Sequence, residues 1–111
     1  MNTKYNLELY NLKAEISKAF SDAKRLIIIA ELRDGEKTVG ELVEASGMPQ
    51  AIISRQLAIL RTRGVVIPRR AGNNVFYSLS DHRICEACDI VHEVLLNHLA
   101  RNRKLAESLL A

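Results

Sequence analysis

Segment 38–63 reads "TVGELVEASGMPQAIISRQLAILRTR", two amphipathic stretches separated by a single glycine. Thr38 and Glu41 have the spacing of a capping box, which predicts that a short helix begins directly after Thr38. Gly47 ends that helix, and Pro49 suits the first turn of a second helix, where its missing N–H costs nothing. A short helix, a tight glycine turn and a longer helix predict a helix-turn-helix over this segment.

The remaining sequence predicts the elements that surround this motif. They are a helix over 5–20, a helix over 23–32 that follows Ser21 and Asp22 as N-cap candidates, two β-strands over 65–70 and 75–79, and a last helix over 81–110. Gly72, Asn73 and Asn74 lie between the strands and tolerate the positive φ of a tight hairpin turn. The 111 residues suffice for one domain. We therefore expect a single, mainly α domain over residues 1–111 with a small β-hairpin wing over 65–79, a winged helix-turn-helix fold.

Charge is distributed unevenly along the chain, although the net charge is only +3. All thirteen acidic residues lie outside Ala45–Ser80. The same window carries the arginines at positions 55, 61, 63, 69 and 70. A segment with arginines and no carboxylates is what a surface facing a polyanion requires. A solvated basic face is the alternative that charge alone leaves open.

The second helix of the motif separates its side chains into two faces when it is drawn at about 100° per residue. Ile53, Leu57 and Leu60 gather on one side, and the opposite side carries Gln50, Ala51, Ser54, Arg55, Ala58 and Arg61. Glutamine pairs with adenine, arginine pairs with guanine, and serine bonds to a base or a phosphate. The small alanines let such a helix approach base edges closely. This face predicts a helix that reads the major groove of DNA.

The hairpin adds candidate phosphate contacts to this surface. Arg69 and Arg70 alternate sides on a strand, so we expect one of them to face phosphate while the other points elsewhere. Asn73 and Asn74 at the hairpin tip are expected to enter a minor groove or to lie along the backbone. The predicted DNA-binding residues are Gln50, Ala51, Ser54, Arg55, Arg61, Arg69, Arg70, Asn73 and Asn74.

From Ala19 to Asp81 the sequence resembles the ArsR/SmtB family of bacterial transcriptional repressors, most specifically in "ISRQLAILRTRGVV" and "VFYSLSD". The resemblance implies a winged-helix homodimer that binds a palindromic operator in double-stranded DNA and releases it when an inducer binds. It also implies that helices 5–20 and 81–110 form the dimer interface and that residues 50, 51, 54 and 55 contact bases. Pro49, Ile52 and Asn73 depart from the family pattern, which affects the expected operator sequence and the contribution of the wing.

The sensor sites best known in this family are not matched by the sequence. The first helix of the motif contains no cysteine, and Arg83, Val94 and Asn97 stand where further ligands of the last-helix site are expected. The last helix instead contains "CEACDIVHE", with Cys85, Cys88 and His92 at i, i+3 and i+7.

Two thiolates one turn apart can share a soft ion such as zinc, arsenite or copper(I), or they can be oxidised or persulfidated. His92 lies about 10 Å along the helix from Cys85, so a metal site with His92 would need a partner copy. Cysteine is also a small apolar residue that suits a packed helix interface, and this structural role stays open as the alternative.

Other functional classes find less support in the sequence. We find no nucleophile–base pair and no phosphate-cradling glycine loop, so we expect no enzyme activity. The longest apolar run near the N-terminus, "LIIIA", is too short to cross a membrane. The start of the chain lacks the pattern of a signal peptide, so we expect a cytoplasmic protein without a membrane partner. A constitutive DNA-binding regulator, or a winged helix that binds protein and senses nothing, remains the alternative.

Overall fold

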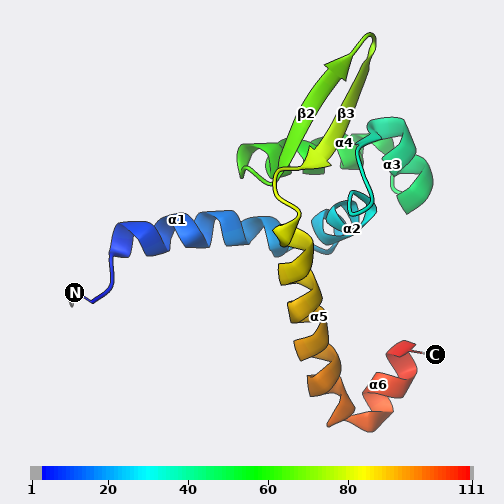
Figure 1. Cartoon of the computed structure of the whole chain (residues 1–111). Helices are drawn as coiled ribbons and strands as arrows, with labels where there is room; N and C mark the ends of the chain where they lie inside the picture. The colour runs from blue at the N-terminus through cyan, green and yellow to red at the C-terminus, as the bar shows by residue number, and fades with distance from the viewer. Residues whose placement is uncertain (1–3, 111) are drawn as a thin grey trace. The chain divides into compact units, whose positions relative to one another are not determined.

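The structure is a computed structural model that describes residues 4–110, apart from the side chains of residues 104–106. It divides between Asp81 and His82 into two compact units, which we describe separately (Figure 1). The first unit contains α1 (Leu7–Ser17), the short 3-10 helix η1 (Lys18–Phe20), α2 (Ala23–Glu31), β1 (Lys37–Thr38), α3 (Val39–Ser46), α4 (Gln50–Thr62), β2 (Val66–Ala71) and β3 (Asn74–Leu79). The second unit contains α5 (Arg83–Ala100) and α6 (Arg103–Leu110).

Local capping interactions place the ends of the helices in the helix-turn-helix. The Oγ1 atom of Thr38 accepts from the Glu41 N–H at 3.2 Å, and the Glu41 carboxylate accepts from the Thr38 N–H at 2.9 Å. The predicted capping box is therefore confirmed. Gly47 ends α3 with φ +75°, a left-handed conformation that is accessible to glycine at little cost.

The core of the first unit is aliphatic and lies between α2, α3, α4 and the start of β2. Its fully buried side chains are Ile28, Ile29, Leu32, Leu42, Ile53, Leu57, Leu60 and Val65. Because α2, α3 and α4 all contribute to one apolar core, the helix-turn-helix is held as a rigid body rather than as an isolated pair of helices.

The wing is part of a three-stranded antiparallel sheet with the order β1-β3-β2. β2 and β3 pair from Val66↔Leu79 to Ala71↔Asn74, which leaves a two-residue turn. Of the turn residues only Gly72 has positive φ, at +61°, so Asn73 does not use the left-handed conformation that we considered for it. The strand β1 was not predicted, because two residues carry too little alternation to be seen in a sequence.

The first and last helices differ from the sequence-based expectation. The predicted helix 5–20 is the α-helix α1 followed by the tighter turn η1. The predicted helix 81–110 was wrong as one continuous helix, because α5 ends at Ala100 and α6 begins at Arg103. The N–H groups of Arg101 and Asn102 bond to carbonyls three residues back, at 3.2 and 2.9 Å, which tightens and ends α5. None of the helices described within residues 4–110 has the length and apolar character needed to cross a membrane.

Candidate DNA interface

The helix α4 presents an exposed polar face, as its sequence predicts. Gln50, Ala51, Ser54 and Arg55 are all exposed, whereas Ile53 and the other apolar residues of the opposite side are buried. The predicted contacts near the N-terminus of α4 therefore lie at the surface, where a duplex could reach them. Arg61, in the last turn of the helix, is exposed as well.

Pro49 fixes where this face begins. Pro49 is the N-cap of α4 rather than its first helical residue, and its carbonyl accepts from the N–H groups of Ile52 and Ile53 at 3.1 Å. The glycine at position 47 and this proline turn the chain sharply between α3 and α4. As a result, Gln50 is the first residue of α4 and its N–H and side chain stand at the exposed end of the helix.

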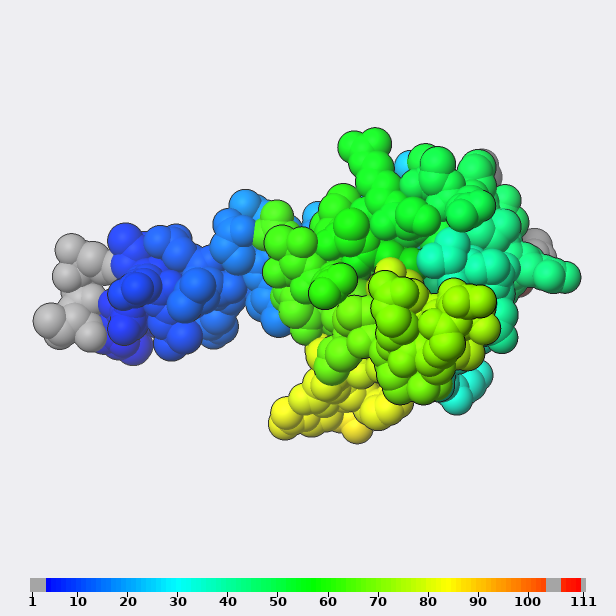
Figure 2. Space-filling model, turned by 90° about the horizontal axis from the view of Figure 1, so that it is seen from above, coloured from blue at the N-terminus to red at the C-terminus, as the bar shows by residue number. Residues whose placement is uncertain are grey.

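The wing lies beside α4, and the two elements share the face of the first unit that Figure 2 shows from above. In that view the green atoms of α4 adjoin the yellow-green atoms of β2 and β3. Arg70, Asn73 and Asn74 of the wing are exposed. The acid-free window Ala45–Ser80 spans both elements, so every charged side chain that they contribute is an arginine.

The two neighbouring arginines of β2 have different environments. The Nε atom of Arg69 donates to Oε2 of Glu36 at 3.0 Å, and a second nitrogen of the guanidinium bonds to Oε1. The guanidinium carbon also lies 4.9 Å from the centre of the Phe76 ring. The hydrogen bond from Arg69 lowers the pKa of the Glu36 carboxyl, and the same bond raises the pKa of Arg69. Arg70 is exposed and has no ion pair within the described part of the chain.

One buried polar residue of α4 was not predicted to matter. Gln56 is only 6% exposed, and its Oε1 atom accepts from Nη1 of Arg25 at 3.0 Å. Arg25 also donates to the carbonyls of Lys18 and Ala19, each at 3.0 Å. A glutamine that interrupts the buried side of an amphipathic helix is the signal that points to such a bond, since a buried amide needs a partner.

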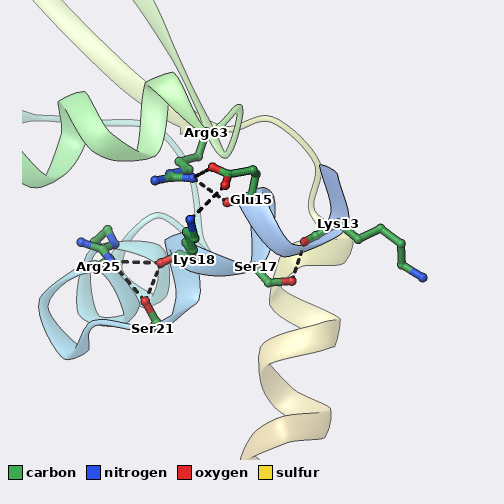
Figure 3. A network of polar contacts seen from close by, with 7 residues as sticks. All are labelled: Lys13, Glu15, Ser17, Lys18, Ser21, Arg25 and Arg63. Carbon is green, nitrogen blue, oxygen red and sulfur yellow. Dashed lines mark hydrogen bonds and ion pairs between the residues drawn. The ribbon is translucent and has the colours of Figure 1, made fainter. Parts of the chain in front are cut away.

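The C-terminal end of α4 carries a second contact that the sequence did not reveal. Nη1 of Arg63 donates to the backbone carbonyl of Glu15 at 3.0 Å and also bonds to its carboxylate (Figure 3). Lys18 bonds to the same carboxylate at 2.9 Å. Hydrogen bonds from Lys18 and then Arg63 lower the pKa of Glu15. Arg63 is thus directed toward α1, although its position in the acid-free window suggested a side chain that faces a polyanion.

The residues of the predicted sensor lie on α5 in the second unit. Cys85 is 6% exposed, Cys88 is half-buried, and neither forms a disulfide bond within the described residues. His92 is exposed. Among the residues that the structure describes, no three His, Cys, Asp or Glu side chains are grouped so that they could hold a metal ion. One copy of the chain therefore offers two soft donors one helical turn apart.

Comparison with known proteins decides the family of this chain. A model for bacterial regulatory proteins of the arsR family matches residues 22–67. An uncharacterised HTH-type transcriptional regulator of Mycobacterium tuberculosis, Rv0081, is 36% identical over 104 residues, which are 93% of this chain and 91% of that protein. The chain belongs to the ArsR family.

Solved structures agree with this membership. The crystal structure of Mycobacterium tuberculosis Rv0081 superposes on this ArsR-family chain with a TM-score of 0.76 at 36% identity, covering 85% of this chain and 95% of that one. A solution structure from Mycobacterium bovis, described as a homodimeric winged helix-turn-helix DNA-binding domain, gives 0.77 at 27% identity and covers 91% and 95%. The mainly α fold with a small β-hairpin wing is thereby confirmed as a winged helix-turn-helix.

A further relative is named as a transcriptional repressor. The HTH-type transcriptional repressor SmtB of Mycobacterium tuberculosis is 36% identical over 77 residues, which are 69% of this chain. The match spans 57% of the length of that relative. All three relatives are named as transcriptional regulators or as DNA-binding domains rather than as enzymes.

Proposed function

We propose that this ArsR-family chain is a homodimeric transcriptional repressor that binds a palindromic operator in double-stranded DNA. The observation that carries the proposal is the exposed polar face of α4, with Gln50, Ser54 and Arg55 outward and Ile53 buried behind them. The names of its relatives, among them a repressor, support the direction of regulation. Because its target is chromosomal DNA, we place the protein in the cytoplasm.

In this proposal α4 lies in the major groove with its N-terminal turns against base edges. The amide of Gln50 can pair with adenine and the guanidinium of Arg55 with guanine, while Ser54 bonds to a base or a phosphate. The small side chain of Ala51 leaves room for the helix to approach. Arg61, Arg69 or Arg70, and the wing-tip residues Asn73 and Asn74 would contact the backbone and fix the register.

The proposed homodimer is supported by the exposed apolar side chains of α1 and of α5. Leu9, Leu12 and Ile16 are about half exposed or more on α1, and Val91 and Leu95 are exposed on α5. Large apolar side chains in rows of this kind are usually covered by a partner. A two-fold dimer would present two copies of α4 to successive turns of a duplex, about 34–36 Å apart.

The proposal is tested by selecting duplexes from a random DNA library with the purified protein and measuring their binding by fluorescence anisotropy. Arg55→Ala should weaken binding of the selected duplex by about 5- to 150-fold per base contact, the effect of losing 1–3 kcal/mol. Lys24→Ala removes the same charge from an exposed site on α2, outside the predicted dimer helices and the predicted DNA contacts, and should leave affinity within about twofold. If the protein selects no sequence, or if both variants behave alike, the proposal is wrong.

We further propose that Cys85 and Cys88 sense the inducer. Two thiols one turn apart suit a soft ion such as zinc, arsenite or copper(I), and a third donor such as His92 would come from the partner copy. The same pair could instead be oxidised or persulfidated. Operator binding is measured with zinc, arsenite, copper(I), persulfide and peroxide in turn, and at least one of them should change the binding of wild type and not that of Cys85→Ser/Cys88→Ser. If no agent changes wild-type binding, the protein is a constitutive regulator and the thiols only pack.

A further inference from the structure

Two polar contacts join the DNA-reading helix to the N-terminal part of the chain, one directly to α1 and one to α2. At the C-terminal end of α4, Arg63 bonds to both the carbonyl and the carboxylate of Glu15 (Figure 3). In the middle of α4, Gln56 bonds to Arg25, which in turn holds the carbonyls of η1. We call these four residues the α1–α4 brace. Its two long-range contacts join residues 48 and 31 positions apart in the sequence.

The brace holds α1, a helix that has no buried residue and whose direction is therefore not determined by packing against the core. No residue of α1 is buried, and α1 extends outward from η1 (Figure 1). By contrast, Ala19 in η1 is fully buried, so the base of α1 is anchored while its length is exposed. The bonds of Glu15 to Arg63 therefore act at the anchored end of α1, where a small change of angle is amplified along the helix.

We propose that the α1–α4 brace sets the spacing between the two DNA-reading helices of the dimer, and hence the half-site spacing that the protein accepts. Glu15, Arg25, Gln56 and Arg63 are positioning residues in this scheme and contact no DNA. The inference rests on the proposed function, since it requires that α1 forms part of a dimer interface and that α4 reads bases.

The geometry of α1 makes the effect large enough to measure. Leu7 lies eight residues before Glu15, about 12 Å along the helix. A tilt of roughly 15–20° at Glu15 therefore moves the far end of α1 by about 3.4 Å, which is the rise of one base pair. If the dimer is joined through α1, a tilt of this size changes the separation of the two α4 helices by a comparable distance.

The Glu15–Arg63 pair can determine the direction of α1 while contributing little to the stability of the fold. The Arg63 side chain is 28% exposed and the Glu15 side chain 54% exposed. Ion pairs with this degree of exposure contribute little to the free energy of unfolding. Removing the pair should therefore leave the chain folded, which allows its effect on DNA spacing to be measured in a folded protein.

The first test uses the duplex selected by wild type and a series in which the half-site spacing is changed by one or two base pairs. Wild type should bind the selected spacing at least tenfold more tightly than spacings one base pair longer or shorter. Arg63→Ala and Glu15→Gln should reduce that ratio to threefold or less, and the conservative variant Arg63→Lys, which can still donate to the carbonyl and the carboxylate of Glu15, should retain most of it. An unchanged ratio in Arg63→Ala, or an equal loss of affinity at every spacing, would overturn the proposal.

The chain supplies a matched control for this substitution. Lys37 bonds to both the carbonyl of Glu31, at 2.7 Å, and its carboxylate, at 3.1 Å, as Arg63 does to Glu15. Lys37 is 28% exposed, as Arg63 is, and Glu31 is 31% exposed, but this pair joins the end of α2 to β1 rather than α1 to α4. Glu31→Gln should therefore retain the wild-type spacing preference. If Glu31→Gln changes it as Arg63→Ala does, the effect is general loosening and the brace is refuted.

The second test needs no DNA and separates this inference from the proposed function. Spin labels at Ala58→Cys, an exposed site on α4, would report the distance between the two copies by electron paramagnetic resonance. The background is Cys85→Ser/Cys88→Ser. We expect one narrow distance distribution that Arg63→Ala broadens or shifts by several ångströms. If DNA selection fails while Arg63→Ala broadens the distribution, the proposed function and the half-site part of the inference fall, and the brace stands only as what sets the distance between the two α4 helices. If selection succeeds and neither measurement changes, the brace alone is wrong.

Discussion

The adjacent arginines of β2 allow a direct test of how the wing meets DNA. Both arginines are exposed, but Arg69 is engaged by both oxygens of Glu36 and by the Phe76 ring, whereas Arg70 has no ion pair within the described residues. We therefore predict that Arg70 makes the phosphate contact and that Arg69 keeps the wing in place. The comparison is between Arg70→Gln, which removes one positive charge, and the paired change Glu36→Gln/Arg69→Gln, which leaves the net charge unaltered.

The expected magnitude follows from counterion release. Each phosphate contact contributes about 0.9 to the slope of log affinity against log salt concentration. A homodimer loses two contacts in Arg70→Gln, so the slope should become less steep by about 1.8. Between about 50 and 200 mM salt, the ratio of wild-type to variant affinity should then fall roughly twelvefold.

Fluorescence anisotropy titrations of the selected duplex at four or five salt concentrations would measure these slopes. The paired variant should lose affinity without a change in slope, because no phosphate contact is removed. Thermal unfolding of both variants would show whether any loss of affinity reflects unfolding. An unchanged slope in Arg70→Gln, or the same change of slope in both variants, would refute the assignment of the phosphate contact to Arg70.

Three further predictions concern stability. Leu57→Ala should lower the free energy of unfolding by about 2–5 kcal/mol in a denaturant titration, because it opens a cavity in the core. Ser54→Ala, on the exposed side of the same helix, should change this free energy by less than about 0.5 kcal/mol. Similar values for the two variants would mean that α4 does not pack as described. Thr38→Ala should cost about 1 kcal/mol in the same titration through loss of the capping box, and no loss would show that the cap is not needed to start α3. The pKa of Glu36 lies below its ordinary value of 4.5 because Arg69 bonds to its charged form, so the pair stabilises the fold above about pH 4.5 and this contribution is lost as the pH falls through the lowered pKa. The difference in melting temperature between wild type and Glu36→Gln should accordingly be largest near neutral pH and shrink in acid, and a difference independent of pH would contradict this reasoning.

Local rules were enough to predict the helix-turn-helix from the sequence. Three of its features depend only on residues close together in the chain. They are the capping box at Thr38, the left-handed conformation of Gly47 and the helical spacing of apolar residues in α4. They act in the same way wherever the chain folds, so a pattern in the sequence identifies them. For the same reason the exposure of Gln50 and Arg55 could be predicted from the spacing of their apolar neighbours.

Interactions between distant residues could not be predicted in this way. β1 exists because it pairs with β3, and its two residues carry no pattern of their own. The partners of the arginines are likewise set by packing, since Glu36 and Arg69 are separated by 33 positions and Glu15 and Arg63 by 48. From the sequence alone, Arg63 and Arg69 were both expected to belong to one basic surface.

What the sequence alone determined is the order of the helices up to α4 and of the two wing strands, and the face of α4 that points outward, because these depend on backbone preferences and on burial at regular spacing. What only the tertiary structure decided is which charges remain available to a polyanion. A carboxylate outside the acid-free window reaches Arg69 and another reaches Arg63 once the chain is folded. Coulombic attraction depends on distance in space rather than along the chain, so a count of arginines in a window cannot distinguish those that bind DNA from those that hold the fold together.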